Sequence, residues 1–148
     1  MFVRQFVSDS SPQLPPRLAA GFNSEQPRKD LPSILVVDDE TIIADTLTQI
    51  LNRNGFRAHA CYGGREAIDT ARRLQPSVVL SDIAMPQIDG IAAAVAIREF
   101  CPAARIVLFS GQSATLEILD RIRSLGHEFE LLPKPIHPTE LLRRLRQN

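Results

Sequence analysis

The sequence predicts an α/β fold in which a doubly wound parallel sheet of five strands is covered by helices on both faces. Short β-branched runs alternate five times with longer stretches of helical periodicity, a pattern typical of consecutive βα units. The strand runs are almost wholly apolar, as expected for strands buried on both faces. Crossovers between such strands are nearly always right-handed, which leaves few other topologies.

The first half of the chain is expected to form strands at 34–37 and 57–61 and helices at 40–53 and 64–74. The run ILVV at 34–37 has no polar residue and predicts a buried strand. Gly55 is placed to end the first helix. Apolar residues on one face support that helix, namely Ile43, Leu47, Ile50 and Leu51.

The second half repeats the alternation. Gly90 introduces an alanine-rich helix, Gly126 ends the next one, and Pro138 suits the first turn of the last, where its missing N–H is harmless. The elements expected here are strands at 78–80, 105–109 and 128–132 and helices at 91–100, 113–125 and 138–146.

Residues 1–32 are expected to be a disordered leader, and residues 33–148 a single domain. The leader holds five of the eleven prolines and shows no lasting periodicity. Such a segment cannot bury enough apolar area to offset the entropy lost on ordering. The total of 148 residues suits one domain of ordinary size.

Composition argues against several classes of protein. The 17 basic and 17 acidic residues balance, so net charge favours neither nucleic acid nor a membrane surface as a partner. No apolar run approaches the roughly 18 residues that span a bilayer, and the N-terminus lacks the apolar core of a signal peptide. Two cysteines, Cys61 and Cys101, predict neither a disulfide framework nor a zinc site. A reduced, cytoplasmic chain is expected.

Polar residues follow the predicted strands at the points where the strands end. The carboxyl ends of parallel strands share one edge of the sheet, and open α/β sheets bind ligands along that edge. The residues brought there are Asp38 and Asp39 after the first strand, Asp82 after the third, Ser110 after the fourth and Lys134 after the fifth.

Three clustered carboxylates need a compensating cation. Two like charges 4 Å apart repel by about 4 kcal/mol at an effective dielectric constant near 20, and Lys134 supplies only one positive charge. A hard divalent ion with oxygen ligands is the natural remedy, and Mg²⁺ fits a site with few protein ligands. An aspartate in such a pocket can act as a nucleophile and form an aspartyl phosphate.

Four motifs resemble those of the response-regulator receiver family: ILVVDDE, LSDIAMPQIDG, LFSGQ and LPKP. They stand in the family's order and spacing, and the resemblance covers residues 33–148. It implies a flavodoxin-like (βα)5 fold with strand order 2-1-3-4-5. It also implies a stand-alone receiver in a two-component phosphorelay, because the given chain ends with its fifth helix.

The resemblance implies that Asp82 is the phosphoacceptor, phosphorylated in a Mg²⁺-dependent reaction. Asp39 would bind the metal directly and Asp38 would position it. The Asp82 carboxylate and the backbone carbonyl of Ala84 would complete the protein ligands.

By the same resemblance, Lys134 would pair with the phosphoryl oxygens and the Ser110 hydroxyl would donate a hydrogen bond to them. The Lys134–Pro135 peptide would be cis. Among the histidines, none of which shows ligand spacing, His137 is placed to cap the last helix.

Two positions depart from the family pattern. Leu131 stands where the family often has a tyrosine or phenylalanine that turns inward on phosphorylation, and the nearest aromatic residue is Phe129. The output would then rely on backbone shifts of the 110–125 region. Ala84 offers no polar side chain beside the phosphoryl group, which predicts an altered phosphoryl lifetime.

The expected partners are a sensor histidine kinase or histidine phosphotransfer protein, an unidentified output protein, and a second copy through residues 113–147. Neither nucleic acid nor a membrane is expected as a direct partner. The chain would be a phosphoacceptor signalling domain rather than an enzyme.

Three alternatives are a degenerate receiver that acts as a scaffold, an Asp-nucleophile phosphohydrolase and a flavodoxin-like binding module. The hydrolase would need a second aspartate where Ala84 stands. The binding module would need a hydroxyl- and glycine-rich phosphate loop where the sequence has DDE.

Overall fold

The structure, a computed structural model, describes residues 31–111 and 115–147. The predicted leader lies outside the described residues except for Leu31 and Pro32. The elements, in chain order, are β1 Ser33–Val37, α3 Thr41–Arg53, β2 Arg57–Cys61, α4 Gly64–Leu74, β3 Val78–Asp82, α5 Gly90–Phe100, β4 Arg105–Ser110, α6 Thr115–Ser124, β5 Glu130–Pro133 and α7 Pro138–Arg146.

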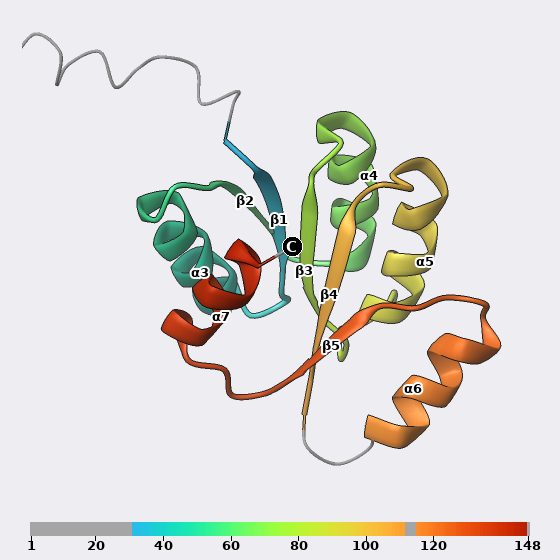
Figure 1. Cartoon of the computed structure of the whole chain (residues 1–148). Coiled ribbons are helices and arrows are strands. Elements are labelled where there is room, and N and C mark those ends of the chain that lie inside the picture. Colours follow the sequence, from blue (N-terminus) through green and yellow to red (C-terminus); the bar gives the residue numbers. More distant parts are fainter. Residues whose placement is uncertain (1–30, 112–114, 148) are drawn as a thin grey trace, which may run out of the picture. The chain divides into compact units, whose positions relative to one another are not determined.

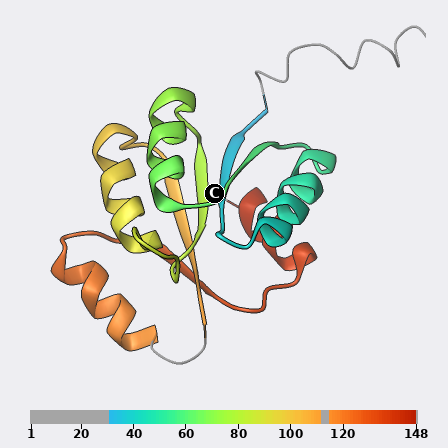
Figure 2. The same ribbon diagram turned by 180° about the vertical axis from the view of Figure 1, so that it is seen from behind.

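The five strands form one parallel sheet in the order β2-β1-β3-β4-β5, as the sequence predicted. Figure 1 shows the sheet between two layers of helices, with α3 and α7 on one side and α4 and α5 on the other. The opposite view in Figure 2 shows the same layers. The strand order reverses between β1 and β3, so a crevice is expected outside their carboxyl ends.

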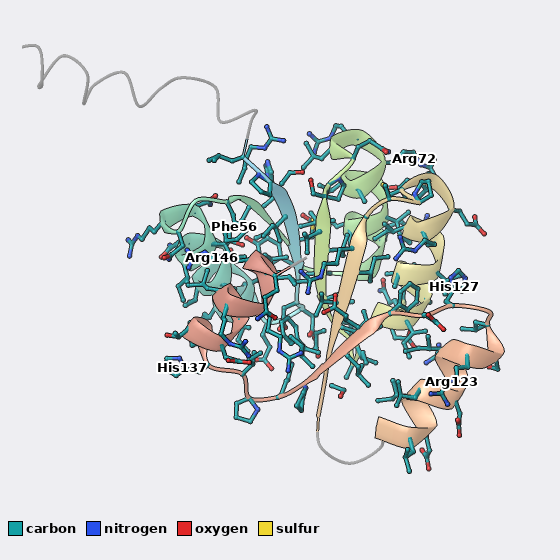
Figure 3. The ribbon with its side chains drawn as sticks, viewed as in Figure 1. Phe56, Arg72, Arg123, His127, His137 and Arg146 are labelled. Atoms are coloured by element: carbon teal, nitrogen blue, oxygen red, sulfur yellow. The ribbon has the colours of Figure 1, made fainter. Side chains whose placement is uncertain are left out.

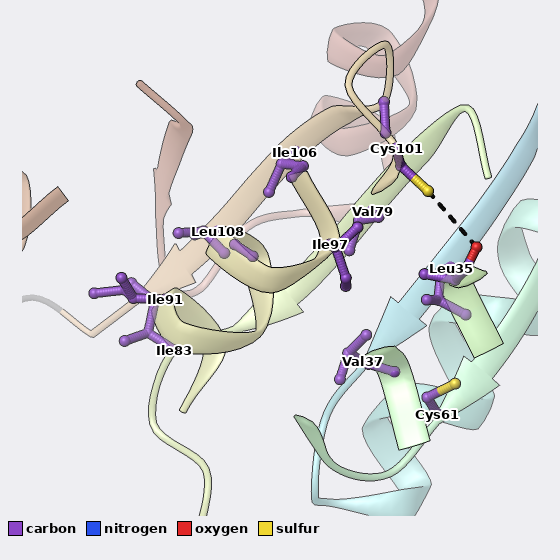
Figure 4. Close-up of a cluster of buried hydrophobic side chains, with 14 of the residues drawn as sticks. Leu35, Val37, Cys61, Val79, Ile83, Ile91, Ile97, Cys101, Ile106 and Leu108 are labelled. Carbon is purple, nitrogen blue, oxygen red and sulfur yellow. Dashed lines mark hydrogen bonds between the residues drawn. The ribbon is translucent and has the colours of Figure 1, made fainter. Parts of the chain in front are cut away.

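Alternate side chains along each strand point to opposite faces of the sheet and pack into two separate cores. Leu35, Val79 and Leu108 face α4 and α5 and pack with Ile91 and Ile97. Figure 4 shows this core, in which the Cys101 thiol contacts the backbone carbonyl of Ala71 at 3.6 Å. The other core packs against α3 and α7, and its members include Ile34, Leu80, Phe109, Leu51 and Leu141.

The apolar face predicted for the first helix is buried only in part. Leu51 is fully buried, but Ile43 stays exposed at the N-terminal end of α3, beside the still more exposed Ile42. No helix or strand in the described part of the chain buries these two side chains.

The fifth strand begins at Glu130, later than the predicted 128. The residues just before Glu130 still belong to the turn that ends α6. In this turn Gly126 has a φ of +79°, and the His127 N–H donates a hydrogen bond to the Ile122 carbonyl. The His127 and Phe129 rings then stack with centroids 5.3 Å apart. The first two residues of the predicted helix 113–125 lie outside the described residues.

Both cysteines are buried and unpaired, which agrees with the prediction of no disulfide framework. Within residues 31–111 and 115–147, no helix combines the length and the apolarity required to cross a bilayer.

Candidate functional site

The sequence-predicted polar residues meet at the carboxyl edge of the sheet. Asp82 and Ser110 are the last residues of β3 and β4, and Asp38 and Lys134 directly follow β1 and β5. Because β3 lies between β1 and β4, Asp82 occupies the middle of the group. Parallel pairing of the strands thus brings together residues that are distant in the sequence.

Lys134 forms an ion pair with Asp82. Its Nζ lies 2.8 Å from Oδ1 of Asp82, whose side chain keeps only 11% of its surface exposed. The hydrogen bond raises the pKa of Lys134, together with the charges of Asp82 and Asp38, although burial acts in the opposite direction. Lys134 is therefore held as an ammonium beside the candidate nucleophile.

The three carboxylates of Asp38, Asp39 and Asp82 form the cluster that the sequence predicted. One oxygen from each lies within 4.8 Å of the others. Asp38 is buried, and its Oδ1 accepts a hydrogen bond of 2.9 Å from the Glu40 N–H. Burial, with the charge of Asp82, raises the pKa of Asp38 despite this hydrogen bond.

This cluster fits a hard divalent cation. Carboxylate oxygens are the ligands that Mg²⁺ prefers, and the cluster places three carboxylates beside the single ammonium of Lys134. Asp39 is exposed and Asp38 is buried, so the cluster opens to solvent on one side. Ala84, whose backbone carbonyl is expected as a third metal ligand beside the Asp82 carboxylate, lies exposed on the loop after β3.

Ser110 has a buried hydroxyl without a hydrogen-bond partner among the described residues. Its backbone carbonyl accepts a 2.8 Å hydrogen bond from the Lys134 N–H, so Ser110 and Lys134 are fixed to one another. A buried polar atom left unpaired costs about 1–3 kcal/mol, which suggests that it has a partner in another state of the site. The Lys134–Pro135 peptide is cis, as predicted.

The loop from Asp82 to α5 is tightly closed. The Gly90 N–H donates to the Ile83 carbonyl at 2.8 Å, and a Cβ at Gly90 would collide with the carbonyl oxygen of Asp82. Sequence reasoning missed the role of Asp89, which caps α5 through the Ala92 N–H and pairs with Arg121 of α6. An aspartate just before an apolar helical run is a capping signal, but nothing in the sequence indicates the partner on α6.

An apolar groove of about 370 Å³ adjoins the site, between α3 and the segment that leads into α7. Asp38 and Lys134 stand at its polar end, and Ile42, Ile43 and Ile136 line its walls. The sequence did not predict this groove, because the periodicity that places Ile43 on one apolar face of the helix does not show how much of that face is covered.

Leu131 is half-buried against the core formed with α4 and α5. The nearest aromatic side chain, Phe129, packs under the Arg98 guanidinium, whose carbon lies 5.7 Å from the ring centroid. Phe129 therefore has fixed partners away from the carboxylates. His137 caps α7 by accepting from the Thr139 N–H at 3.1 Å, as predicted.

Comparison with known proteins agrees with this geometry. The sequence model of the response regulator receiver domain matches residues 34–146. Chemotaxis protein CheY of Thermotoga maritima is 29% identical over 113 residues, which span 76% of this chain and 92% of CheY. The DNA-binding response regulator MtrA of Mycobacterium tuberculosis is 31% identical over 113 residues, but the chain spans only 48% of its length.

Solved structures show the same fold. A CheY-like receiver domain protein from Methanospirillum hungatei superimposes with a TM-score of 0.72 at 26% identity, covering 79% of this chain and 92% of that one. CheY4 of Vibrio cholerae gives a TM-score of 0.71 at 25% identity, covering 79% of this chain and 98% of that one. Motif order, strand order and the family match agree over the same residues, and the chain therefore belongs to the response regulator receiver domain family.

Proposed function

We propose that this chain is a phosphoryl-accepting receiver of a two-component phosphorelay, with Asp82 as the residue that is phosphorylated. The observation that carries the proposal is the position of Asp82, which has a carboxylate oxygen within 4.8 Å of oxygens of Asp38 and Asp39 and lies 2.8 Å from the Lys134 ammonium. The family membership of the chain supports it.

The reaction proposed is a nucleophilic displacement at phosphorus. A carboxylate oxygen of Asp82 forms a bond to the phosphorus of a phosphohistidine on the donor protein, and the P–N bond breaks with its electron pair remaining on the imidazole. Positioning and charge stabilisation provide most of the catalysis in phosphoryl transfer. The buried Asp82 would supply a fixed nucleophile, and the half-buried Lys134 would supply the charge stabilisation.

Asp38, Asp39, the Asp82 carboxylate and the Ala84 carbonyl would hold Mg²⁺. When bound, the ion would neutralise the clustered carboxylates and stabilise charge on the phosphoryl oxygens. The ion would also free Lys134 to interact with the incoming phosphoryl group, because Asp82 would no longer depend on it for charge compensation.

Ser110 provides a donor for the phosphorylated state. Its buried hydroxyl lacks a partner among the described residues and lies at the end of the strand beside β3. A hydrogen bond to a phosphoryl oxygen on Asp82 would satisfy it and would draw the start of the 110–125 region toward the site.

The phosphorylated chain would signal by binding an output protein or a second copy through residues 113–147, within the cytoplasm. In this role the domain catalyses only its own phosphorylation and dephosphorylation. It would receive its phosphoryl group from a sensor histidine kinase or a histidine phosphotransfer protein.

Incubation with acetyl phosphate and Mg²⁺ tests the proposal. We expect an acid-stable, base-labile mass increase of one phosphoryl group in the wild type and none in Asp82→Ala. A mass increase that persists in Asp82→Ala would refute the assignment of Asp82. Absence of phosphorylation by any donor would favour a scaffold, and sustained phosphate release from unrelated phosphoesters would favour a hydrolase.

A further inference from the structure

One carboxylate, that of Asp89, connects two helices. Its Oδ1 accepts a 2.8 Å hydrogen bond from the Ala92 N–H at the start of α5, and its Oδ2 accepts one of 2.8 Å from Nη1 of Arg121 on α6. Burial opposes ionisation, but Arg121 and the backbone N–H groups lower the pKa of Asp89. The carboxylate is therefore ionised and fully engaged.

The ion pair adds a contact to a helix that buries few of its described side chains. Among the α6 side chains that the structure describes, Ile122 alone is buried, and Ile118 packs partly against the same core. Leu116 is 77% exposed at the start of the helix. Figure 1 shows α6 at the margin of the helix layer, beyond α5.

Asp89 is also tied to the phosphoacceptor. It ends the loop that begins at Asp82, and the hydrogen bond from the Gly90 N–H to the Ile83 carbonyl closes this loop. The contact of Gly90 with the Asp82 carbonyl leaves no space between the two ends. A displacement of Asp89 therefore moves the backbone of Asp82 or breaks these contacts.

We infer that the Arg121–Asp89 ion pair couples the position of α6 to the phosphorylation state of Asp82, a role that Leu131 cannot fill as an aromatic switch. This inference rests on the proposed function of Asp82. Coupling between two sites is reciprocal, so phosphorylation that shifts the 82–89 loop changes how firmly α6 is held. Arg121 is a positioning residue in this scheme, because it acts through Asp89 and does not touch the reacting atoms.

Hydrogen exchange of the α6 amides, measured with and without Mg²⁺ and acetyl phosphate, tests the coupling. In the wild type we expect phosphorylation to change α6 exchange rates by about two- to fivefold, the range that an exposed ion pair can account for. Arg121→Gln should remove more than half of this change. Asp89→Asn should do the same, because asparagine still caps α5 but carries no charge.

Arg123→Gln is the matched control, since Arg123 lies on the same helix and has no ion pair recorded in the described structure (Figure 3). It should retain the wild-type change. The double variant Asp89→Asn with Arg121→Gln should lose no more than either single variant, as expected for partners in one interaction. Mass spectrometry of each variant reports whether Asp82 is phosphorylated.

Phosphorylated Arg121→Gln that keeps the full α6 response would overturn the coupling and leave the proposed function intact. A wild-type protein that is phosphorylated on Asp82 without any change in α6 exchange would also overturn the coupling and leave the proposed function intact. A wild-type protein that accepts phosphate from neither acetyl phosphate nor a phosphohistidine donor would overturn both.

Discussion

The Lys134 ammonium reaches Asp82 across the end of a strand that belongs to neither residue. Asp82 ends β3, Lys134 follows β5, and β4 lies between them in the sheet, yet Nζ and Oδ1 are 2.8 Å apart. The hydrogen bond from the Lys134 N–H to the Ser110 carbonyl at the end of β4 fixes this reach. The ion pair is therefore a property of the sheet topology, not of any local sequence.

Removal of the ammonium should slow phosphorylation. For Lys134→Ala we expect a loss of at least about 100-fold in the rate with acetyl phosphate at saturating Mg²⁺, the scale seen when a preorganised charge donor is deleted. Lys134→Arg keeps the charge but replaces a compact ammonium with a planar fork, so it should recover part of the rate. The rate of mass increase measures both, and equal rates in wild type and Lys134→Ala would contradict the role of Lys134.

Asp38 should make the metal-free protein less stable at neutral pH. Its pKa is raised above the ordinary 3.8 by burial and by Asp82, so the folded state favours the protonated form. A raised pKa contributes stability that is fully present below the unfolded pKa and is lost as pH rises through the folded pKa. In EDTA at pH 7, Asp38→Asn should therefore unfold at a higher temperature, by ~4 °C for a gain on the order of 1 kcal/mol.

Two further measurements follow for Asp38→Asn. Asparagine can still accept from the Glu40 N–H, so the gain should disappear below about pH 3.8, where the wild-type carboxyl is protonated too. Mg²⁺ should raise the unfolding temperature of the wild type more than that of the variant. Equal stabilisation of both by Mg²⁺ would remove Asp38 from the metal site.

Much of this site could be predicted from the sequence because it depends on strand ends. Asp38, Asp82, Ser110 and Lys134 follow apolar runs whose parallel pairing places them at one edge, whatever the details of packing. Asp89, Arg121 and the exposure of Ile43 could not be predicted in this way. The first two interact across distant elements, and helical periodicity shows which residues share a face but not how much of that face is covered.

Gly90 should tolerate no side chain. A Cβ there would lie 2.9 Å from the carbonyl carbon of Asp82 and still closer to its oxygen. For Gly90→Ala we expect a loss of about 1–3 kcal/mol in unfolding free energy, the usual cost of overpacking. Phosphorylation should slow as well, because the Asp82 backbone must move.

Gly63→Ala is the control for Gly90, since the same added methyl group would meet nothing within 4 Å. Its stability should fall by less than that of Gly90→Ala, by about 0.5–1 kcal/mol, because alanine is a poorer N-cap residue than glycine but meets no steric clash here. Chemical denaturation of both variants gives the comparison, and equal losses would show that crowding at Asp82 is not the cause.

Arg105 should stabilise the second half of the fold at neutral pH. Its guanidinium pairs with Glu130 of β5 at 2.8 Å and donates to the Gln147 carbonyl after α7, also at 2.8 Å. The pair lowers the pKa of Glu130 below the ordinary 4.5, although burial acts the other way. Because the pair is partly exposed, Arg105→Met should cost only about 0.5–1 kcal/mol at pH 7.

The cost of Arg105→Met should depend on pH with a definite sign. A lowered pKa contributes stability that is present above the unfolded pKa and is lost as pH falls through the folded pKa. Denaturation at a series of pH values should therefore show the wild type and the variant converging below about pH 4.5. Arg143→Met, which removes an exposed partner of Glu140, is the control and should change stability less at every pH.

The groove beside the site should distinguish protein donors from small ones. Ile42 is 79% exposed at its wall, and Lys134, which pairs with Asp82, also lines the groove, so we expect a protein donor to contact this surface. Ile42→Ser should slow transfer from a phosphohistidine protein by about tenfold, as expected when part of a buried isoleucine contact is lost. The rate with acetyl phosphate should be unchanged, since that donor is too small to need the groove.

Leu116→Ser on α6 is matched in exposure at 77% and lies away from the groove, so it should leave both rates at the wild-type level. Equal slowing of transfer by the two variants would show that general surface apolarity, and not this groove, receives the donor.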